Sequence, residues 1–310
     1  MPHAKGMRVQ QRIRENMPLF DPYWIQALRG LLPWATPLFT AISALGNDYF
    51  YVALIATGYW TMDKQSSARS ALLLLASSVT NYWLKITLRN PRPHPTYWLL
   101  GTTATNYSLP SGHAQSSATI YGWLGIKNQD ARKRALLVLL ILLIGLSRIY
   151  IGVHWPGDIL LGWAVGAAIL TLAWKMEEPA ASTLSKYNPD TLYLGLAAFG
   201  FAALILTEFF SPVNIPGLED NFGANGGLII GLGAGLALER KYVNFTTPEP
   251  GDKRRVILRV ILGLSLVLLT MLVLSPILPT DIYWLRATRY ALTAIVVLFL
   301  WPLIFMKLNI

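Results

Sequence analysis

The stretch SRIYIGVHWPGD, residues 147–158, places an arginine, a histidine and an aspartate between two long apolar runs. Pro156 suits the first turn of a helix, so His154 should lie at or just before a helix start and Asp158 within its first turn. A carboxylate in that position can accept a hydrogen bond from one imidazole nitrogen and leave the other neutral and nucleophilic. We therefore predict His154 as a nucleophile and Asp158 as the residue that orients it.

Three basic side chains suit an anionic substrate. Lys85 and Arg92 lie in the stretch KITLRNPRP, and Arg148 lies in SRIYIGVHWPGD. Their charges are close to what a phosphate of charge about −1.5 to −2 and its transition state would need. The planar fork of arginine also fits phosphate oxygens. We predict that these three residues hold a phosphate group.

The stretch LPSGHAQSSATI adds two helix-start residues and a second histidine. Ser111 and Gly112 are expected where free backbone N–H groups and the helix dipole favour an anion, and Gly112 would let the backbone approach closely. His113 could give a proton to the leaving oxygen. These polar stretches hold one carboxylate and no set of acidic ligands of the kind Mg²⁺ or Mn²⁺ prefers, so we predict chemistry without a metal or another cofactor.

The composition of the 310-residue chain is that of a membrane protein. Hydrophobic residues make up 54% and charged residues 14%, and there is no cysteine for a disulfide or for thiol catalysis. The expected fold class is all-α, a polytopic helical membrane protein with a six-helix core and about four additional C-terminal helices. The net charge of +10 comes from short clusters between apolar runs, which indicates membrane topology rather than binding to nucleic acid.

We predict ten membrane segments from the apolar runs. They lie at about 24–45, 48–63, 68–88, 113–127, 134–152, 157–175, 191–211, 223–239, 256–276 and 285–306. The first is the weakest, because Arg29, Pro33 and Pro37 would suit an interfacial or re-entrant segment as well as a span. The segments define a basic cytoplasmic tail at 1–23, a membrane core at 24–175, a polar linker at 176–190 and additional transmembrane helices at 191–310.

Basic residues cluster in alternate connections, and such clusters are retained in the cytoplasm. The clusters lie in the N-terminal tail and near 64–69, 127–134 and 240–255, whereas the intervening connection 211–222 has two acids and no base. This topology puts the three polar stretches together at the outer face, where Lys85, Arg89 and Arg92 break the charge rule and so need another reason. We expect a multi-pass protein of the plasma (inner) membrane with its site on the outer face.

Glycines recur every four residues in one of the C-terminal segments. They are Gly223, Gly227, Gly231 and Gly235. Such a smooth helix face allows close packing, either against a helix of the same chain or against a second copy in a homo-oligomer.

The three polar stretches together resemble the motifs of the type-2 phosphatidic acid phosphatase family. The matching stretches are KITLRNPRP, PSGH and SRIYIGVHWPGD, in this order. The resemblance implies an α-helical core and metal-independent hydrolysis of a lipid phosphate or pyrophosphate at the outer face. It implies one set of roles: a clamp of Lys85, Arg92, Ser111, Gly112 and Arg148, with His113 as acid, His154 as nucleophile and Asp158 as its partner. Small bacterial members stop after six helices, so the additional helices leave the substrate open.

Several functions remain open at this stage. A phosphatase could act on phosphatidate, phosphatidylglycerol phosphate, undecaprenyl pyrophosphate or a sphingoid-base phosphate, since all present the same group. A lipid phosphotransferase would share the phosphohistidine but pass the phosphate to another acceptor than water. A non-enzymatic transporter or scaffold is the third class, although it would have little use for a paired histidine and aspartate.

Overall fold

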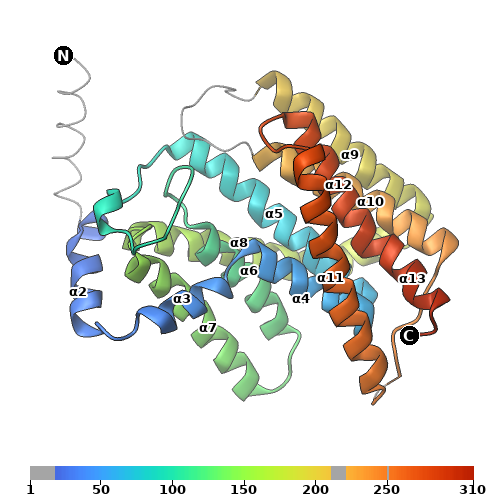
Figure 1. Cartoon of the computed structure of the whole chain (residues 1–310), viewed down its shortest axis with the longest axis horizontal. Helices are drawn as coiled ribbons and strands as arrows, with labels where there is room; N and C mark the ends of the chain where they lie inside the picture. Colours follow the sequence, from blue (N-terminus) through green and yellow to red (C-terminus); the bar gives the residue numbers. More distant parts are fainter. Residues whose placement is uncertain (1–17, 211–220, 250) are drawn as a thin grey trace. The chain divides into compact units, whose positions relative to one another are not determined.

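The computed structural model describes residues 18–210, 221–249 and 251–310, and these ranges are all-helical, without a strand (Figure 1). Seven helical runs among the described residues are long and apolar enough to cross a membrane, one of them the continuous run Tyr283–Lys307. The number is up to eight if the helices Thr36–Ala44 and Asp48–Thr61 count as one broken span. The predicted fold class, a polytopic helical membrane protein, is therefore confirmed. Most of the expected tail at 1–23 and of the connection 211–222 falls outside the described residues.

The chain forms two compact units. The first comprises the described residues up to Asp48 together with Thr80–Leu172, and the second comprises Tyr49–Val79 and Ala173–Ile310. Helices α5 (Lys64–Leu88) and α8 (Pro156–Leu184) contribute to both. The first unit also contains η1 (Pro18–Phe20), α2 (Tyr23–Leu31), α3 (Thr36–Ala44), η2 (Pro95–Tyr97), α6 (Gly112–Ile126) and α7 (Ala131–Ile151). The second contains α4 (Asp48–Thr61), α9 (Pro189–Phe210), α10 (Asn221–Tyr242), α11 (Lys253–Ile277), α12 (Tyr283–Ile295), the π-helical turn η3 (Val296–Leu300) and α13 (Trp301–Lys307).

Local signals set the ends of the helices that carry the polar stretches. Ser111 caps α6, and its side chain accepts a hydrogen bond from the Ala114 N–H. Helix α7 is capped at its C-terminus by Gly152, whose φ of 86° lies in the left-handed region where glycine has no Cβ penalty. Helix α8 begins at Pro156, as predicted from HWPGD. It continues to Leu184, so most of the segment expected as a polar linker, 176–190, is helical.

The first predicted segment, 24–45, is not one helix. It consists of α2 and α3, separated by a break that contains Pro33, where a ring in place of the N–H disrupts helical hydrogen bonding. Each piece has nine residues, well short of the roughly 20 needed to span a bilayer.

Part of the core of the first unit is formed by residues at the end of α7 and the start of α8. Helix α7 packs against α2, α3 and α6. One buried cluster joins Ile25 of α2 and Ala114 of α6 to Trp155 and Ile159 at the start of α8. The polar residues near the start of α8 therefore neighbour a close-packed apolar cluster.

Helix α10 lies between α9 and α12 in the second unit, and Figure 1 shows the three side by side. A Cβ on Gly227 would collide with the backbone oxygen of Ala287, and one on Gly231 would come within 2.5 Å of the Ala291 oxygen. Gly223 and Gly235 face Tyr283 and Leu298 in the same way. The glycine face thus packs within the chain, which is one of the two alternatives that the sequence left open. A homo-oligomer stays a prediction without an assigned surface.

Gly227→Ala is expected to destabilise the protein by about 1 to 3 kcal/mol, because the added methyl forces α10 and α12 apart. Gly195 in α9 is the matched control, since a Cβ there meets nothing within 4 Å. Gly195→Ala should leave the melting temperature unchanged or raise it slightly, as alanine favours a helix. Thermal unfolding in detergent measures both. Equal melting temperatures for the two variants would contradict the packing described.

Candidate active site

The two predicted residues His154 and Asp158 form a buried pair at the start of α8. His154 Nδ1 lies 3.1 Å from Asp158 Oδ2, and the side chains are 3% and 0% exposed. The Trp155 N–H donates to the same carboxylate oxygen at 2.8 Å. Because His154 precedes the helix by only two residues, its ring reaches a carboxylate of the first turn, as the sequence predicted.

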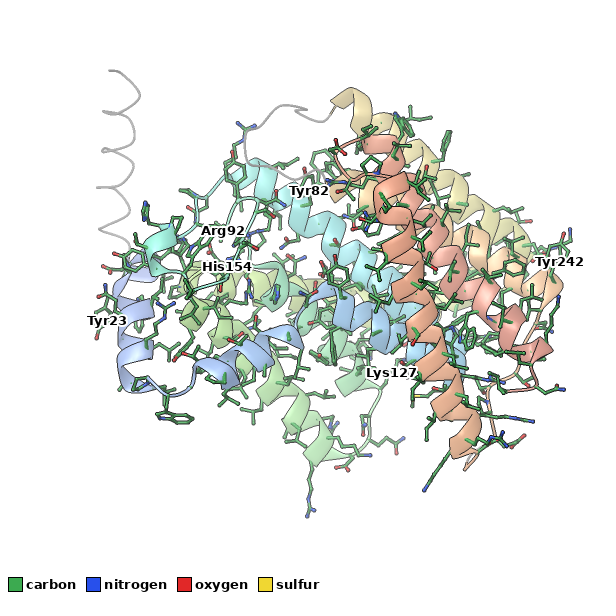
Figure 2. The ribbon with its side chains drawn as sticks, in the orientation of Figure 1. Tyr23, Tyr82, Arg92, Lys127, His154 and Tyr242 are labelled. Atoms are coloured by element: carbon green, nitrogen blue, oxygen red, sulfur yellow. The ribbon has the colours of Figure 1, made fainter. Side chains whose placement is uncertain are left out.

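Arg92 fixes the other nitrogen of the His154 ring. Its Nη1 lies 3.1 Å from His154 Nε2, and Figure 2 shows the two residues side by side. A guanidinium donates hydrogen bonds and cannot accept them, so Nε2 must offer its lone pair. The Nδ1–H then donates to Asp158. This is the tautomer in which Nε2 can act as a nucleophile.

The electrostatic surroundings of His154 favour the neutral ring. Burial lowers its pKa well below the usual value, and the charges of Arg92, Lys85 and Arg148 lower it further, with a smaller effect from His113. The ring is therefore neutral at pH 7. Because their charges affect the pKa of His154, the three predicted cations and His113 lie within electrostatic range of the predicted nucleophile.

Backbone oxygens orient two of the cations. Lys85 donates to the oxygens of Tyr107 and Ser108, and Arg92 Nε donates to the Asn106 oxygen at 2.9 Å. Burial lowers the pKa of Arg92 to about 10, which still leaves it charged at neutral pH. Neutral carbonyls hold these side chains without cancelling their charge.

Arg148 has an unused donor. Its Nη1 donates to the Ser43 hydroxyl at 2.6 Å, whereas its Nε is buried and has no hydrogen-bond partner within the described ranges. A buried donor without a partner costs about 1 to 3 kcal/mol, more for a charged group. Three cations and one carboxylate leave the site with a surplus of positive charge. Both features favour an anion.

The start of α6 lies against the same carboxylate residue. The Ser111 N–H donates to the backbone oxygen of Asp158 at 3.0 Å. A Cβ on Gly112 would lie 3.3 Å from Asn81 Oδ1, a close contact that a glycine avoids. His113 is the second residue of α6 and is partly buried, and its ring makes no hydrogen bond in the described part of the chain. Its nitrogens are therefore available to a ligand.

Two residues that the sequence did not single out complete the shell around Asp158. The Ser108 hydroxyl lies 3.2 Å from Asp158 Oδ1, and Asn90 Nδ2 lies 3.4 Å from the same oxygen. Asn90 Nδ2 also donates to the Ser108 hydroxyl at 3.1 Å. Asn90 lies inside KITLRNPRP and Ser108 lies just before PSGH, and this closeness to the motifs was the only sign in the sequence that they belong to the site. Their partner is 50 or more residues away.

Metal ligation finds no support in the described ranges, which contain no group of three His, Cys, Asp or Glu side chains able to hold an ion. Metal independence itself stays a prediction.

Comparisons with known proteins identify the family. Residues 67–181 match the PAP2 superfamily, and residues 223–310 match the PAP2 superfamily phosphatase, transmembrane extension. An undecaprenyl-diphosphatase of Sulfolobus acidocaldarius is 38% identical over 180 residues, which cover 54% of this chain and 81% of that protein. The chain belongs to the PAP2 superfamily. The PAP2 match contains all eight predicted site residues, and the second match covers most of the helices that go beyond a six-helix core.

Other relatives match over a smaller share of their length. Sphingosine-1-phosphate phosphatase 2 of Mus musculus is 28% identical over 145 residues, 44% of this chain and 41% of that protein. The chain thus spans about four tenths of the curated sphingosine-1-phosphate phosphatase 2 sequences it matches. The crystal structure of a transmembrane PAP2 type phosphatidylglycerolphosphate phosphatase from Bacillus subtilis has a TM-score of 0.44 and 24% identity, covering 51% of this chain and 85% of that chain.

Arg148→Gln is expected to weaken the binding of orthovanadate, a phosphate analogue, by about tenfold or more, because hydrogen bonds to charged groups contribute about 1.5 to 3 kcal/mol. Arg89→Gln is the matched control, since Arg89 is exposed and its Nε donates to the Ile86 oxygen in the preceding helix α5. Titration calorimetry in detergent gives both affinities. Equal losses in the two variants would show that general charge, and not Arg148, holds the anion.

Proposed function

We propose that this PAP2 protein is a membrane phosphatase that hydrolyses a lipid phosphate or pyrophosphate through a phosphohistidine. The observation that carries the proposal is the state of His154, which is neutral, held at Nδ1 by Asp158 and directed at Nε2 toward a cation of the predicted clamp. A nucleophile oriented by a third group beside a positive site is the arrangement that covalent phosphoryl transfer needs. The names of the relatives support the substrate class.

The proposed reaction has two steps. Nε2 of His154 attacks phosphorus, and the bond from phosphorus to the lipid oxygen breaks while His113 gives that oxygen a proton. Water then attacks the phosphohistidine while His113, neutral after the first step, takes a proton from it; the P–N bond breaks, its electron pair returns to His154 Nε2, and inorganic phosphate leaves. Arg92 now donates to Nε2, so an arriving phosphate would take over this N–H and release the lone pair. Lys85 and Arg148 would neutralise the equatorial oxygens, the role that metal ions take in other phosphatases.

The membrane and the side of the site are also proposals. The helices and the family make the protein multi-pass. The basic clusters support a plasma (inner) membrane orientation with the site on the outer face. The substrate would be phosphatidate, phosphatidylglycerol phosphate, undecaprenyl pyrophosphate or a sphingoid-base phosphate, whose chain stays in the bilayer while the phosphate enters the site.

Radiolabelled lipid phosphate should label the wild-type protein when the reaction is quenched in alkali, where phosphohistidine survives, and should release inorganic phosphate in the presence of EDTA. His154→Ala should abolish the label and lower kcat by at least about 10³-fold, because the group that forms the P–N bond in the first step is then missing.

The outcomes of this experiment separate the alternatives. Activity that is lost in EDTA and restored only by a divalent cation contradicts the metal-free mechanism. Label that passes to a lipid or sugar acceptor instead of water identifies a phosphotransferase. Unchanged function of His154→Ala would favour a transporter or scaffold.

The pH dependence of kcat/KM should show an acid limb below the usual histidine pKa of about 6.5. Burial and the nearby cations lower the pKa of His154, so the neutral, active form persists above this lowered value and is lost only as the pH falls through it. The profile must first be corrected for the substrate phosphate, whose second pKa is about 6. A corrected midpoint at or above about 6.5 would contradict the described environment of His154.

A further inference from the structure

Helix α2 packs at the end of the first unit where α7 ends and α8 begins. Ile25 on its inner face is fully buried, in one cluster with Trp155 and Ile159. Just before α2, the ring of Phe20 covers Gly157 so closely that a Cβ there would collide with it. The segment from Phe20 through α2 therefore lies beside the first turn of α8 and at the level of the site.

The orientation of α2 does not suit a membrane span. In Figure 1, α2 runs crosswise to the first part of α8. Both α7 and α8 are candidate spans, so their ends at Ile151 and Pro156 mark one surface of the membrane. With nine residues, α2 is about 14 Å long, whereas the hydrocarbon core is about 30 Å thick. A short helix that lies crosswise at the ends of spans lies in the plane of the interface.

The outer face of α2 has the side chains of an interfacial helix. Tyr23 is 62% exposed, Trp24 43% and Leu31 77%, and Trp34 just after the helix is 70% exposed. In water these apolar surfaces would be unfavourable. At the level of lipid headgroups tyrosine and tryptophan are enriched, and leucine can enter the acyl region. Because α2 lies beside the ends of the spans α7 and α8, we expect its exposed face to contact the lipid surface.

The inner face of α2 carries Arg29, which bonds to the structure around the site. Its Nε donates to the Tyr150 oxygen and its Nη2 to the Tyr97 oxygen, each at 2.7 Å. A cation at the last carbonyls of α7 is also favoured by the helix dipole. A Cβ on Gly152 would lie 2.8 Å from Arg29 Nη2 and would collide with the Tyr97 oxygen. Arg29 therefore packs directly on the residue at which α7 ends.

This contact lies between two groups of the site. Gly152 follows Arg148 by four residues and precedes His154 by two, so the turn pinned by Arg29 connects a cation of the clamp to the nucleophile. We propose that α2 is an interfacial helix seated in the lipid surface on the side of the site, and that Arg29 on its inner face positions the turn between Arg148 and His154. The catalytic part of this proposal rests on the proposed function. In this proposal the phosphate of the substrate lies at the same membrane surface, so α2 fixes the depth of the Gly152 turn relative to the lipid headgroups.

Cysteine labelling tests the placement of α2, and the absence of natural cysteines leaves a clean background. A membrane-impermeant maleimide is applied to sealed vesicles with Gln26→Cys on the exposed side of α2, Leu100→Cys in the loop after η2 and Gln129→Cys between α6 and α7. Gln26→Cys should react from the same side as Leu100→Cys and not from the side of Gln129→Cys. Reaction together with Gln129→Cys, or only after the membrane is dissolved, overturns the placement.

Kinetics in reconstituted vesicles test the role of Arg29. Arg29→Gln should lower kcat about tenfold or more and leave KM within about twofold. The clamp keeps its charges in this variant, whereas a shift of the nucleophile by about 1 Å can lower the rate by about 10²-fold. Arg29→Lys should recover part of kcat, since an ammonium can bond one carbonyl but lacks the fork for two. Gln26→Cys, on the same helix, is the control and should match the wild type.

The outcomes distinguish positioning from a purely structural contact. A lower melting temperature for Arg29→Gln with unchanged kcat of the folded protein overturns the positioning role, as does a rise in KM alone. If the wild type hydrolyses no lipid phosphate, the proposed function fails, whereas the labelling result still decides where α2 lies.

Discussion

Asp158 is the residue on which the arrangement of the site depends. One carboxylate oxygen binds the His154 ring, and the other binds the side chains of Ser108 and Asn90. Its backbone oxygen accepts the N–H of Ser111. A buried carboxylate without such partners would cost several kcal/mol, so the loop after α5, the start of α6 and the start of α8 must take up their positions together. The orientation of the nucleophile therefore depends on the packing of these three chain segments around Asp158.

The cations of the site are held differently from its carboxylate. Lys85 and Arg92 donate to backbone oxygens, which are neutral, so their charges stay uncompensated except for one aspartate. Arg148 keeps a buried N–H without a partner in the described residues. Such donors are already in place before an anion arrives, and a preorganised positive site is what stabilises charge that develops at phosphorus.

The second unit has a core and a polar anchor of its own. Lys64 and Glu239 form an ion pair at 2.8 Å, and Lys64 also donates to the Phe245 oxygen. The eight predicted site residues all come from the first unit, so the additional helices contribute none of them. The sequence predicted these helices from hydropathy, and it predicted the smooth face of α10 from glycine spacing. It could not choose the helix packed on that face, because a smooth face fits α12 of the same chain as well as another copy.

The sequence by itself determined the features that are local. Apolar runs indicated most of the spans, but the predicted segment 113–127 is the 15-residue helix α6, which is not among the seven or eight candidate spans of the described residues. The spacing of His154 and Asp158 across a helix start was enough to predict their hydrogen bond. Only the tertiary structure decided which distant groups complete the site, such as Ser43 at Arg148, 105 residues apart. It also decided that the segment 24–45 is two short helices, of which α2 lies at the level of the site. The reason is physical. Hydrophobic periodicity and capping report the state of a few neighbouring residues, whereas a partner across the fold is fixed by packing, which no single stretch encodes.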